Sequence, residues 1–492
     1  MNLPLSARLP GVLDAAPLTA QEAGLLKKLY NQLTANSARN RLRTLYYDGE
    51  RSLRRAGELG MSMPPQLGKL ESVIGWPAKA VEVLDNRLDL EGFVVSGQAE
   101  TDGSLDEIVS DNDLIVESSQ THIASMTHGV AFATVSAGDP LAGEPPVIVQ
   151  TRSALDATAL WSQRSRCIVA GLTVNRGVEG AESDEVCLWL PDATLSIIAA
   201  DGGLIVHRIP HNLGRVPMVM LPYRPRLGKA FGMSRISRPL MDATDAAART
   251  IIRMEGTAEF FSFPQRYALN VHKDDFEEDV FATYLNRLLT LAPPEDGGPA
   301  PQMGTFAAAS PEPHIAQLRA LATLVSGETG IPPNALGIIH DNPSSADAIR
   351  AAEAELVKIA ERAQVVYGHA WCEVMRIAQQ LRDGTPDDRL AGLRAQWRDP
   401  STPTKAANAQ MVFSLVSAGI LPAQSEVTWE LLGLDRTTIS RLKAHAAAGR
   451  ARDRIDKLLL PPRPEQEDDE TATDDEDSAE RAGLGETLDD VL

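Results

Sequence analysis

Two glycine–lysine pairs come nearest to a phosphate-binding loop in this sequence, and both fail its requirements. Gly68-Lys69 and Gly228-Lys229 lack the first glycine of such a loop, and leucine or alanine replaces the hydroxyl residue that would hold magnesium. The metalloprotease, paired-cysteine and nucleophile-elbow patterns are also absent from the sequence. We therefore expect no catalytic residue, no cofactor and no bound metal.

An acidic run at residues 274–279 is another candidate for chemistry. Its carboxylates would suit a divalent cation, because such cations prefer oxygen ligands. They also suit the first turn of a short helix, where the helix dipole favours negative charge. His272 and His340 each stand without a second histidine at metal-ligand spacing. The helix interpretation is favoured, and a nuclease or hydrolase with a degenerate site is one alternative.

Composition restricts the class of protein further. The chain has 492 residues and a formal net charge of -20, so two or more domains are expected. Residues 463–492 carry thirteen acids against two arginines, and we expect this acidic tail to be disordered. The remainder is also acidic, which argues against a surface that wraps DNA tightly. No membrane span or signal peptide is expected, and three scattered cysteines fit a reducing compartment.

The first half of the chain combines helices with short strands. The spacing of apolar residues predicts helices over about 18–55 and 67–88, followed by a strand at 90–95. Between about 111 and 221, short β-rich runs recur between Gly, Pro and Asp turns. This pattern predicts a meander or a small β-domain.

The second half is mainly helical. Apolar residues repeat at threes and fours over 236–261 and 312–328, with a strand near 267–271 and a proline- and glycine-rich loop between them. Further helices are expected at 405–417, 425–432 and 438–460, the last of them ending before a double proline.

The longest helix is expected over 344–381. Ser344 and Asp347 form a capping-box pattern at its start. Its apolar stripe continues for about four heptads, and Tyr367 and Trp371 are interpreted as projecting from a second face. We therefore expect this helix to need packing partners on more than one side.

Four groups of short motifs follow one another along the chain. They are Leu45-Tyr46-Tyr47-Asp48-Gly49-Glu50; Gly232-x-Ser234-x-Ile236 with Phe263-Pro264-Gln265-Arg266; Gly330-Ile331-Pro332-Pro333-x-x-Leu336-Gly337 with Asn342-Pro343-Ser344-Ser345-Ala346-Asp347-Ala348-Ile349-Arg350; and Trp397-Arg398-Asp399-Pro400 with Ala418-Gly419-Ile420-Leu421-Pro422. In order and spacing, this set resembles the portal proteins of tailed double-stranded DNA bacteriophages, in the branch common among siphophages of actinobacteria. The resemblance covers about residues 46–442.

The resemblance implies an α+β portal fold with named segments. They are a helical and β-rich wing (1–232), a first stem helix (233–262), a small α/β clip (263–310), a second stem helix (311–329), a tunnel loop (330–344), a long bridging helix (344–382), a helical crown (383–460) and the acidic tail (461–492). In this family the stem helices line a channel and the tunnel loop faces DNA. The clip segment of this chain is short and rich in Pro and Gly.

The resemblance also implies which residues meet the channel. For the tunnel loop these are Ile338, Ile339, His340, Asp341 and Asn342, and the long helix begins at Ser344 with Asp347. For the stem helices they are Asp242, Asp245, Arg249, Arg253, Gln317 and Arg319, a mixed set of charges rather than a basic lining. Such a lining suits loose contact with DNA that does not depend on base sequence.

The implied function is that of a structural ring subunit, commonly one of a dodecamer, at the portal vertex of a phage head. The implied partners are other copies of the chain, the terminase large subunit, a head–tail connector, the major capsid protein, the scaffolding protein and double-stranded DNA, with no membrane. Assembly in the host cytoplasm and residence in the virion follow from the same resemblance. Another head-assembly or minor capsid protein is the principal alternative.

Overall fold

The computed structural model describes residues 18–50, 72–95, 103–175, 185–200, 203–261, 266–270, 299–300, 302–305, 307, 310–337, 346–401, 405–434 and 436–459. They divide into two compact units, Met1–Ser401 and Thr402–Leu492, and each unit is described by itself. The first combines helices with antiparallel sheets and the second is helical. The α+β class expected from the sequence is confirmed.

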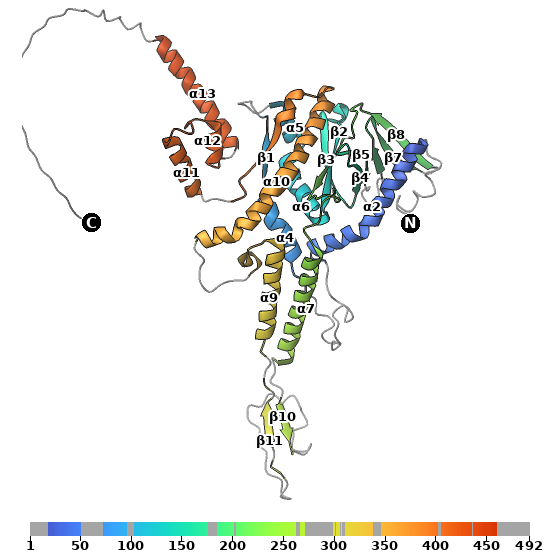
Figure 1. Ribbon diagram of the computed structural model, residues 1–492, viewed down its shortest axis with the longest axis vertical. Helices are drawn as coiled ribbons and strands as arrows, with labels where there is room; N and C mark the ends of the chain where they lie inside the picture. Colours follow the sequence, from blue (N-terminus) through green and yellow to red (C-terminus); the bar gives the residue numbers. More distant parts are fainter. Residues whose placement is uncertain are drawn as a thin grey trace, which may run out of the picture. The chain divides into compact units, whose positions relative to one another are not determined.

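Two antiparallel sheets form the centre of the first unit (Figure 1). One has three strands in the order β3-β2-β9, and the other has five strands in the order β4-β5-β6-β7-β8. The strands are β2 (Val130–Ala137), β3 (Val147–Ser153), β4 (Ala157–Ser162), β5 (Cys167–Asn175), β6 (Glu185–Trp189), β7 (Ala193–Ala200), β8 (Gly203–Pro210) and β9 (Met218–Pro222). Each strand of the larger sheet pairs with the next along the chain, so this sheet is the meander that the short β-rich runs predict.

Alternate side chains of the larger sheet face two different layers. Leu188 of β6 packs with Leu29 of helix α2 (Ala20–Tyr47), which covers one face. The next residue, Trp189, packs with Phe132 of the smaller sheet on the other face. This alternation follows from the two-residue period of a strand. The centre of the sheet is therefore buried on both sides, whereas the edge strand β8 is largely exposed.

Helix α10 (Ala346–Asp383) covers the opposite face of the smaller sheet, against β2, β3 and β9 (Figure 1). Tyr367 and Trp371 are fully buried in the main core. Their assignment to a second face is wrong, because spacings of three and four place them on the same face as Ala363 and Val374. The partners that this helix needs on that face come from its own chain.

Three shorter helices complete the first core. They are α4 (Trp76–Asp85), α5 (Gly103–Asp111) and α6 (Leu114–His128). The helix expected over 67–88 is confirmed only as α4; residues 72–75 are not helical, and residues 67–71 lie outside the described part. Helices α5 and α6 are absent from the sequence-based expectations.

His122 of α6 is enclosed by aromatic side chains. Its ring stacks on Tyr367 with centroids 4.4 Å apart, and Trp397 lies 5.6 Å away. The indole Nε1–H of Trp371 donates to His122 Nε2 at 3.0 Å, which fixes that nitrogen as an acceptor. Burial lowers the pKa of His122 to about 3, so the ring is neutral at physiological pH.

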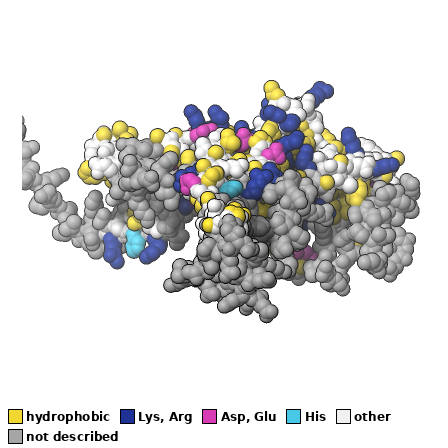
Figure 2. Space-filling view, turned by 90° about the horizontal axis from the view of Figure 1, so that it is seen from below, with side chains coloured by type: hydrophobic (Ala, Val, Ile, Leu, Met, Phe, Trp, Pro, Cys, Tyr) yellow, Lys and Arg dark blue, Asp and Glu magenta, His cyan; other side chains and the backbone are white. Residues whose placement is uncertain are grey.

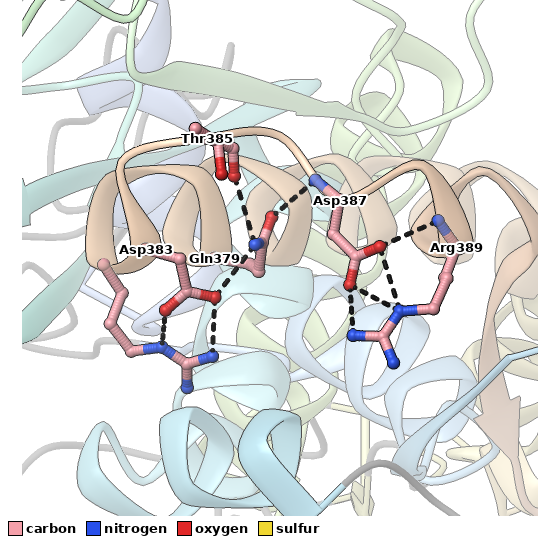
Figure 3. Close-up of polar contacts among 6 residues, drawn as sticks. Gln379, Asp383, Thr385, Asp387 and Arg389 are labelled. Atoms are coloured by element: carbon pink, nitrogen blue, oxygen red, sulfur yellow. Dashed lines mark hydrogen bonds and ion pairs between the residues drawn. The ribbon is translucent and has the colours of Figure 1, made fainter.

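A hydrogen-bonded turn ends α10 (Figure 3). Gln379 Nε2 donates to Asp383 Oδ2 at 2.9 Å and to the Thr385 carbonyl at 3.2 Å, and its Oε1 accepts from the Asp387 amide. Arg389 then pairs with Asp387 at 2.6 Å and lowers the pKa of that carboxyl. These contacts occupy polar groups that the helix end would otherwise leave open.

The chain continues from this turn through the 3₁₀ segment η6 (Asp388–Gly392) into strand β12 (Leu393–Trp397). Strand β12 pairs antiparallel with β1 (Leu90–Val95), and both lie in the first unit. The segment expected as a crown, 383–460, therefore divides between the two units. Its first part joins the main core because Leu390 and Leu393 are buried there.

The second unit consists of helices α11 (Lys405–Ser417), α12 (Glu426–Leu431) and α13 (Arg436–Leu459). Val412, Thr428 and Ile439 are its buried residues among those described. The helices expected at 405–417 and 425–432 are confirmed, as is a last helix. No helix among the described residues is long and apolar enough to cross a membrane.

The enclosed histidine predicts an acid-sensitive core. The unfolded chain binds a proton at His122 near pH 6.5, whereas the folded chain does so only near 3. The neutral, buried ring of His122 therefore makes its full contribution to the free energy of unfolding above pH 6.5. This contribution is lost as the pH falls towards 3, by up to about 1.4 kcal/mol per pH unit. His122→Gln keeps an acceptor for Trp371, and urea unfolding between pH 7 and 5 should show a shallower loss of stability than in the parent chain. The exposed His369→Gln is the control and should follow the parent; equal slopes for all three chains would contradict the assignment.

Candidate functional site at the junction of helices α7 and α9

Helices α7 (Arg238–Phe261) and α9 (Glu312–Thr329) lie side by side in the first unit (Figure 1). They are antiparallel, because Ser237 at the start of α7 donates to Glu328 at the end of α9 at 3.0 Å. Strands β10 (Arg266–Leu269) and β11 (Gln302–Thr305) occur between them in sequence and pair antiparallel. The expected helix–insert–helix order is therefore observed.

Buried Arg235 joins this helix pair to the rest of the unit. Its Nη1 donates to the Tyr223 hydroxyl at 2.9 Å, and its Nη2 donates to the Thr329 carbonyl at 2.9 Å. Its Nε donates to the Ala80 carbonyl. Arg235 is only 7% exposed, so these bonds compensate a charge that has lost most of its water. One side chain thus links α4, the end of β9 and the last turn of α9.

The backbone that positions Arg235 requires glycine. Gly232 has φ +68, in the left-handed region, and a Cβ there would overlap the carbonyl oxygens of Tyr223 and Gly129. Two residues later, Ser234 Oγ donates to the Thr127 carbonyl at 2.5 Å and accepts from the Ile236 amide at 3.0 Å. The Gly232-x-Ser234-x-Ile236 motif is therefore the turn that places Arg235 inward.

A second motif meets the first at this junction. Gly330 ends α9 with φ +70, and Ile331 is 1% exposed. Ile331 packs with Ala80, Leu240 and Val325, so it contacts α4 and both helices of the pair. The 3₁₀ segment η5 (333–336) follows directly. The turn at Gly330 thus places the apolar side chain of Ile331 between α4, α7 and α9.

A third motif supplies Tyr46, whose hydroxyl donates to both carboxylate oxygens of Asp245 at 2.9 Å. This bond joins the end of α2 to α7 across 199 residues of sequence. Asp245 was expected in the stem lining, but its carboxylate is engaged within the chain. The motif residue Tyr46 is buried, and Asp245 is half-buried.

Asp85 of α4 is a second buried charge in this region. The Ser119 hydroxyl donates to its Oδ2 at 2.6 Å. Burial raises the pKa of Asp85 to about 6, with smaller contributions from the neighbouring Asp89 and Glu82. The protonated Asp85 carboxyl therefore stabilises the folded chain at low pH, and this stabilisation is lost as the pH rises through about 6. The pH dependence is opposite to that of His122, whose contribution is lost as the pH falls.

The other predicted site residues lie in different settings. Asp242 is exposed and pairs weakly with Arg238 at 3.8 Å. Arg249 is half-buried, and the exposed members are Arg253, Gln317 and Arg319. The tunnel-loop residues Ile338, Ile339, His340, Asp341 and Asn342, and Ser344, lie outside the described residues; Asp347 lies in α10, and its side chain is not described.

Among the described residues, no group of three or more His, Cys, Asp or Glu could hold a metal ion. The acidic run 274–279, with His272, lies outside the described part. Sequence reasoning missed Arg235, although it sits inside a motif that was recognised.

The chain is similar to known proteins over most of its length. The family model of SPP1 Gp6-like phage portal proteins matches residues 26–444. The portal protein of Mycobacterium phage L5 is 32% identical over 438 residues, covering 85% of this chain and 87% of that protein. The portal protein of Mycobacterium phage D29 is 33% identical over 399 residues, covering 78% of this chain and 80% of that protein. Among solved structures, the neck of a native GTA particle computed with C12 symmetry matches at a TM-score of 0.42 and 14% identity, over 73% of this chain and 89% of that one.

The chain belongs to the family of SPP1 Gp6-like phage portal proteins, since the match spans most of its length. Its role is that of a structural component of the portal vertex of a phage particle. The motifs that carried the resemblance include the two that build the Arg235 junction.

The junction predicts a large effect of one substitution. Arg235→Met should lower the free energy of unfolding by about 3–5 kcal/mol, because buried partners of the guanidinium lose their donors. Arg235→Lys should not restore it, since one ammonium cannot reproduce the fork of the guanidinium. Urea unfolding measures the change. The exposed Arg238→Met is the control, with an expected change within about 0.5 kcal/mol; an Arg235→Met chain as stable as this control would contradict the role given to the junction.

Proposed function

We propose that the chain forms a closed, dodecameric ring through which double-stranded DNA enters and leaves the phage head. The observation that carries this proposal is the antiparallel pair α7–α9, which Arg235 joins to the rest of the unit at one end and which flanks the paired strands β10 and β11 in the sequence. Because Arg235 fixes one end of the helix pair, every copy of the chain would hold its pair at the same angle. One heterologous contact between neighbouring copies, repeated around an axis, would then close a ring.

Within this ring, α7 and α9 would be the stem helices and 263–310 the clip. The other segments would be the wing (1–232), the tunnel loop (330–344), the bridging helix α10 and a crown formed by the second unit. Asp242, Arg249, Arg253, Gln317 and Arg319 would lie on the stem. Their mixed charges would let DNA pass without firm binding, because phosphate binding grows with the number of Lys and Arg contacts.

Exposed apolar side chains support contacts between copies. Leu324 of α9 is 66% exposed, and Phe413 and Ile420 of the second unit are 68% and 67% exposed. Burial of such side chains against another copy would remove apolar surface from water. In the ring, these side chains would lie against neighbouring copies.

The proposed partners follow from the same role. The clip would meet the terminase large subunit and later a head–tail connector, and the wing would meet the major capsid protein and the scaffolding protein. Assembly would take place in the host cytoplasm. The chain would supply structure, and a separate motor would supply the work of DNA movement.

The ring proposal predicts closed particles with an axial channel in negative-stain images of the purified chain. Leu324→Glu should reduce ring formation at least about tenfold, because a charge would lose its water against a neighbour's stem. Leu141→Glu is the control, since Leu141 is also exposed but lies outside the helix pair, and it should form rings normally.

Deletion of residues 466–492 should leave the rings intact. Monomers alone for the parent chain, over a range of salt and protein concentrations, would contradict the ring. Rings of Leu324→Glu in parental yield would contradict the stem contact while leaving the ring itself supported.

A further inference from the structure

Three segments of the first unit carry cations without a single acid. Residues 27–47 contain five Lys or Arg, 157–175 contain two and 223–240 contain five, and none of the three segments contains Asp or Glu. The whole chain has 47 Lys and Arg against 67 Asp and Glu, so these segments depart locally from its acidic balance. In Figure 2, Lys and Arg side chains are spread over the described part of the face that is seen, with fewer Asp and Glu side chains among them.

The three segments line one cleft of about 1080 Å³, formed by α2, by β4 and by the loop that leads from β9 to α7. The residues of α2 in this lining recur near spacings of three and four, so they share one face of the helix. Among the described residues of the lining, Glu328 is the one carboxylate, and it accepts from Ser237. The cations of the lining are Lys28, Arg39, Arg43, Lys229 and Arg238.

Little within the described residues neutralises this charge. Of the five lining cations, only Arg238 has an acidic partner there, Asp242 at 3.8 Å. Further cations are exposed beside the cleft, two in the turn that follows β4 and two in the loop from β9 to α7. They are Arg164, Arg166, Arg224 and Arg226.

Two of the lining cations repel each other within α2. Arg39 precedes Arg43 by four residues, and like charges at this spacing destabilise a helix. Burial and the nearby charge of Arg39 lower the pKa of Arg43 to about 10. Arg43 Nη1 donates to the His128 carbonyl at 2.8 Å, which is an uncharged acceptor. An anion in the cleft would therefore stabilise this pair of charges.

A second pair of like charges is held together by a tight turn. The Lys229 amide donates to the Arg226 carbonyl at 2.8 Å, across a turn in which Gly228 has φ +78. Arg226 and Lys229 thereby lie opposite each other as an antiparallel bridge. Like charges directly opposite in such a pair are destabilising. The fold thus brings cations together at this cleft twice, in two unrelated elements.

The extent of the cationic surface requires a polyanion. Along α2 alone, Lys28 and Arg43 are about 22 Å apart at 1.5 Å per residue. One strand of duplex DNA presents a phosphate every 3.4 Å along the helix axis, so this span matches about six phosphates. Because the cations come from three separate elements, a single small anion would leave most of them without a partner.

We propose that this basic cleft binds the phosphate backbone of double-stranded DNA outside the central channel. The inference rests on the proposed function for the identity of the polyanion, since that function brings duplex DNA to every copy of the chain. None of the residues assigned above to the stem lining contributes to the cleft. Contacts to phosphates position a duplex without reading its bases, so binding at this site is independent of base sequence.

A closed circular DNA duplex tests this site, because it cannot thread a closed ring and therefore reports binding outside the channel. In nitrocellulose filter binding with the full-length chain, the association constant should fall roughly 100- to 500-fold between about 50 and 200 mM salt. This is the fall expected when four or five phosphates release their counterions. Two circles of unrelated sequence should bind equally.

Neutralisation of exposed cations supplies the matched variants. Arg39→Gln and Lys229→Gln should each weaken binding about fivefold and reduce the slope of log K against log salt by about one. Lys358→Gln and Arg362→Gln, which change exposed residues of α10 outside the cleft, should leave affinity and slope as in the parent.

Failure of the circle to bind at about 50 mM salt would overturn the proposal, whether or not a linear duplex binds through the channel. Equal losses in the cleft variants and the α10 variants would do the same. So would a glutamate homopolymer that binds at least as tightly as the circle and is weakened by Arg39→Gln. Binding of the circle by a chain that forms no rings would instead contradict the ring and leave the cleft supported.

Discussion

The guanidinium of Arg235 is the contact on which the arrangement of the first unit depends. It is enclosed by α4, the end of β9 and the last turn of α9, and it donates to each of them. A buried charge is tolerated only while its donors are satisfied, so displacement of one element leaves a cost that the other two cannot offset. The three elements are therefore coupled, and α7, which begins three residues later, takes its direction from them.

This coupling matters because the helix pair has a narrow buried face. Leu240, Ala247 and Ile252 of α7 are buried, but α9 contributes only Ala322, Val325 and Thr329 among its described residues. Helices are stabilised mainly by tertiary packing, and so small an interface gives the pair limited stability by itself. Arg235, Ile331 and Tyr46 stabilise the helix pair at one end. Contacts with other copies of the chain, as proposed, would stabilise the pair along its length.

Sequence periodicity predicted most of the elements that bury apolar side chains, although it missed α5, which buries Leu105, Ile108 and Val109. Helix α2 ends at Tyr47 rather than near 55, but helices α7, α9 and α10 were expected within a few residues of their observed bounds. Helix α6 was not, because its buried face consists largely of Ser118, Thr121, His122 and Ser125, whose partners are distant in sequence. Tyr367 donates to Ser125, and Ser125 donates to the Leu221 carbonyl, so part of this polar face is hydrogen-bonded. His122 Nδ1 is buried without a partner among the described residues. A hydrophobicity pattern carries no signal for such a face.

The strand β12 and the burial of Arg235 were not predicted from the sequence, for related reasons. Five residues of mixed polarity become a strand only because β1, some 300 residues earlier, supplies the other half of the ladder. An arginine in a polar turn is by default a surface residue, and its burial depends on carbonyls brought by α4 and α9. Both outcomes are set by tertiary partners that a local pattern does not contain.

The motifs that carried the resemblance gain a physical meaning from this junction. Gly232 and Gly330 both have positive φ, and Arg235 and Thr329, beside them, are bonded across 94 residues of sequence. A side chain at Gly232 would overlap backbone oxygens, which leave no room to adjust, so only glycine fits. The requirement comes from the geometry of the root and not from DNA. Exposed positions such as Gln317 and Arg319 are under no such requirement from the fold, so whatever fixes their identity must come from outside the single chain.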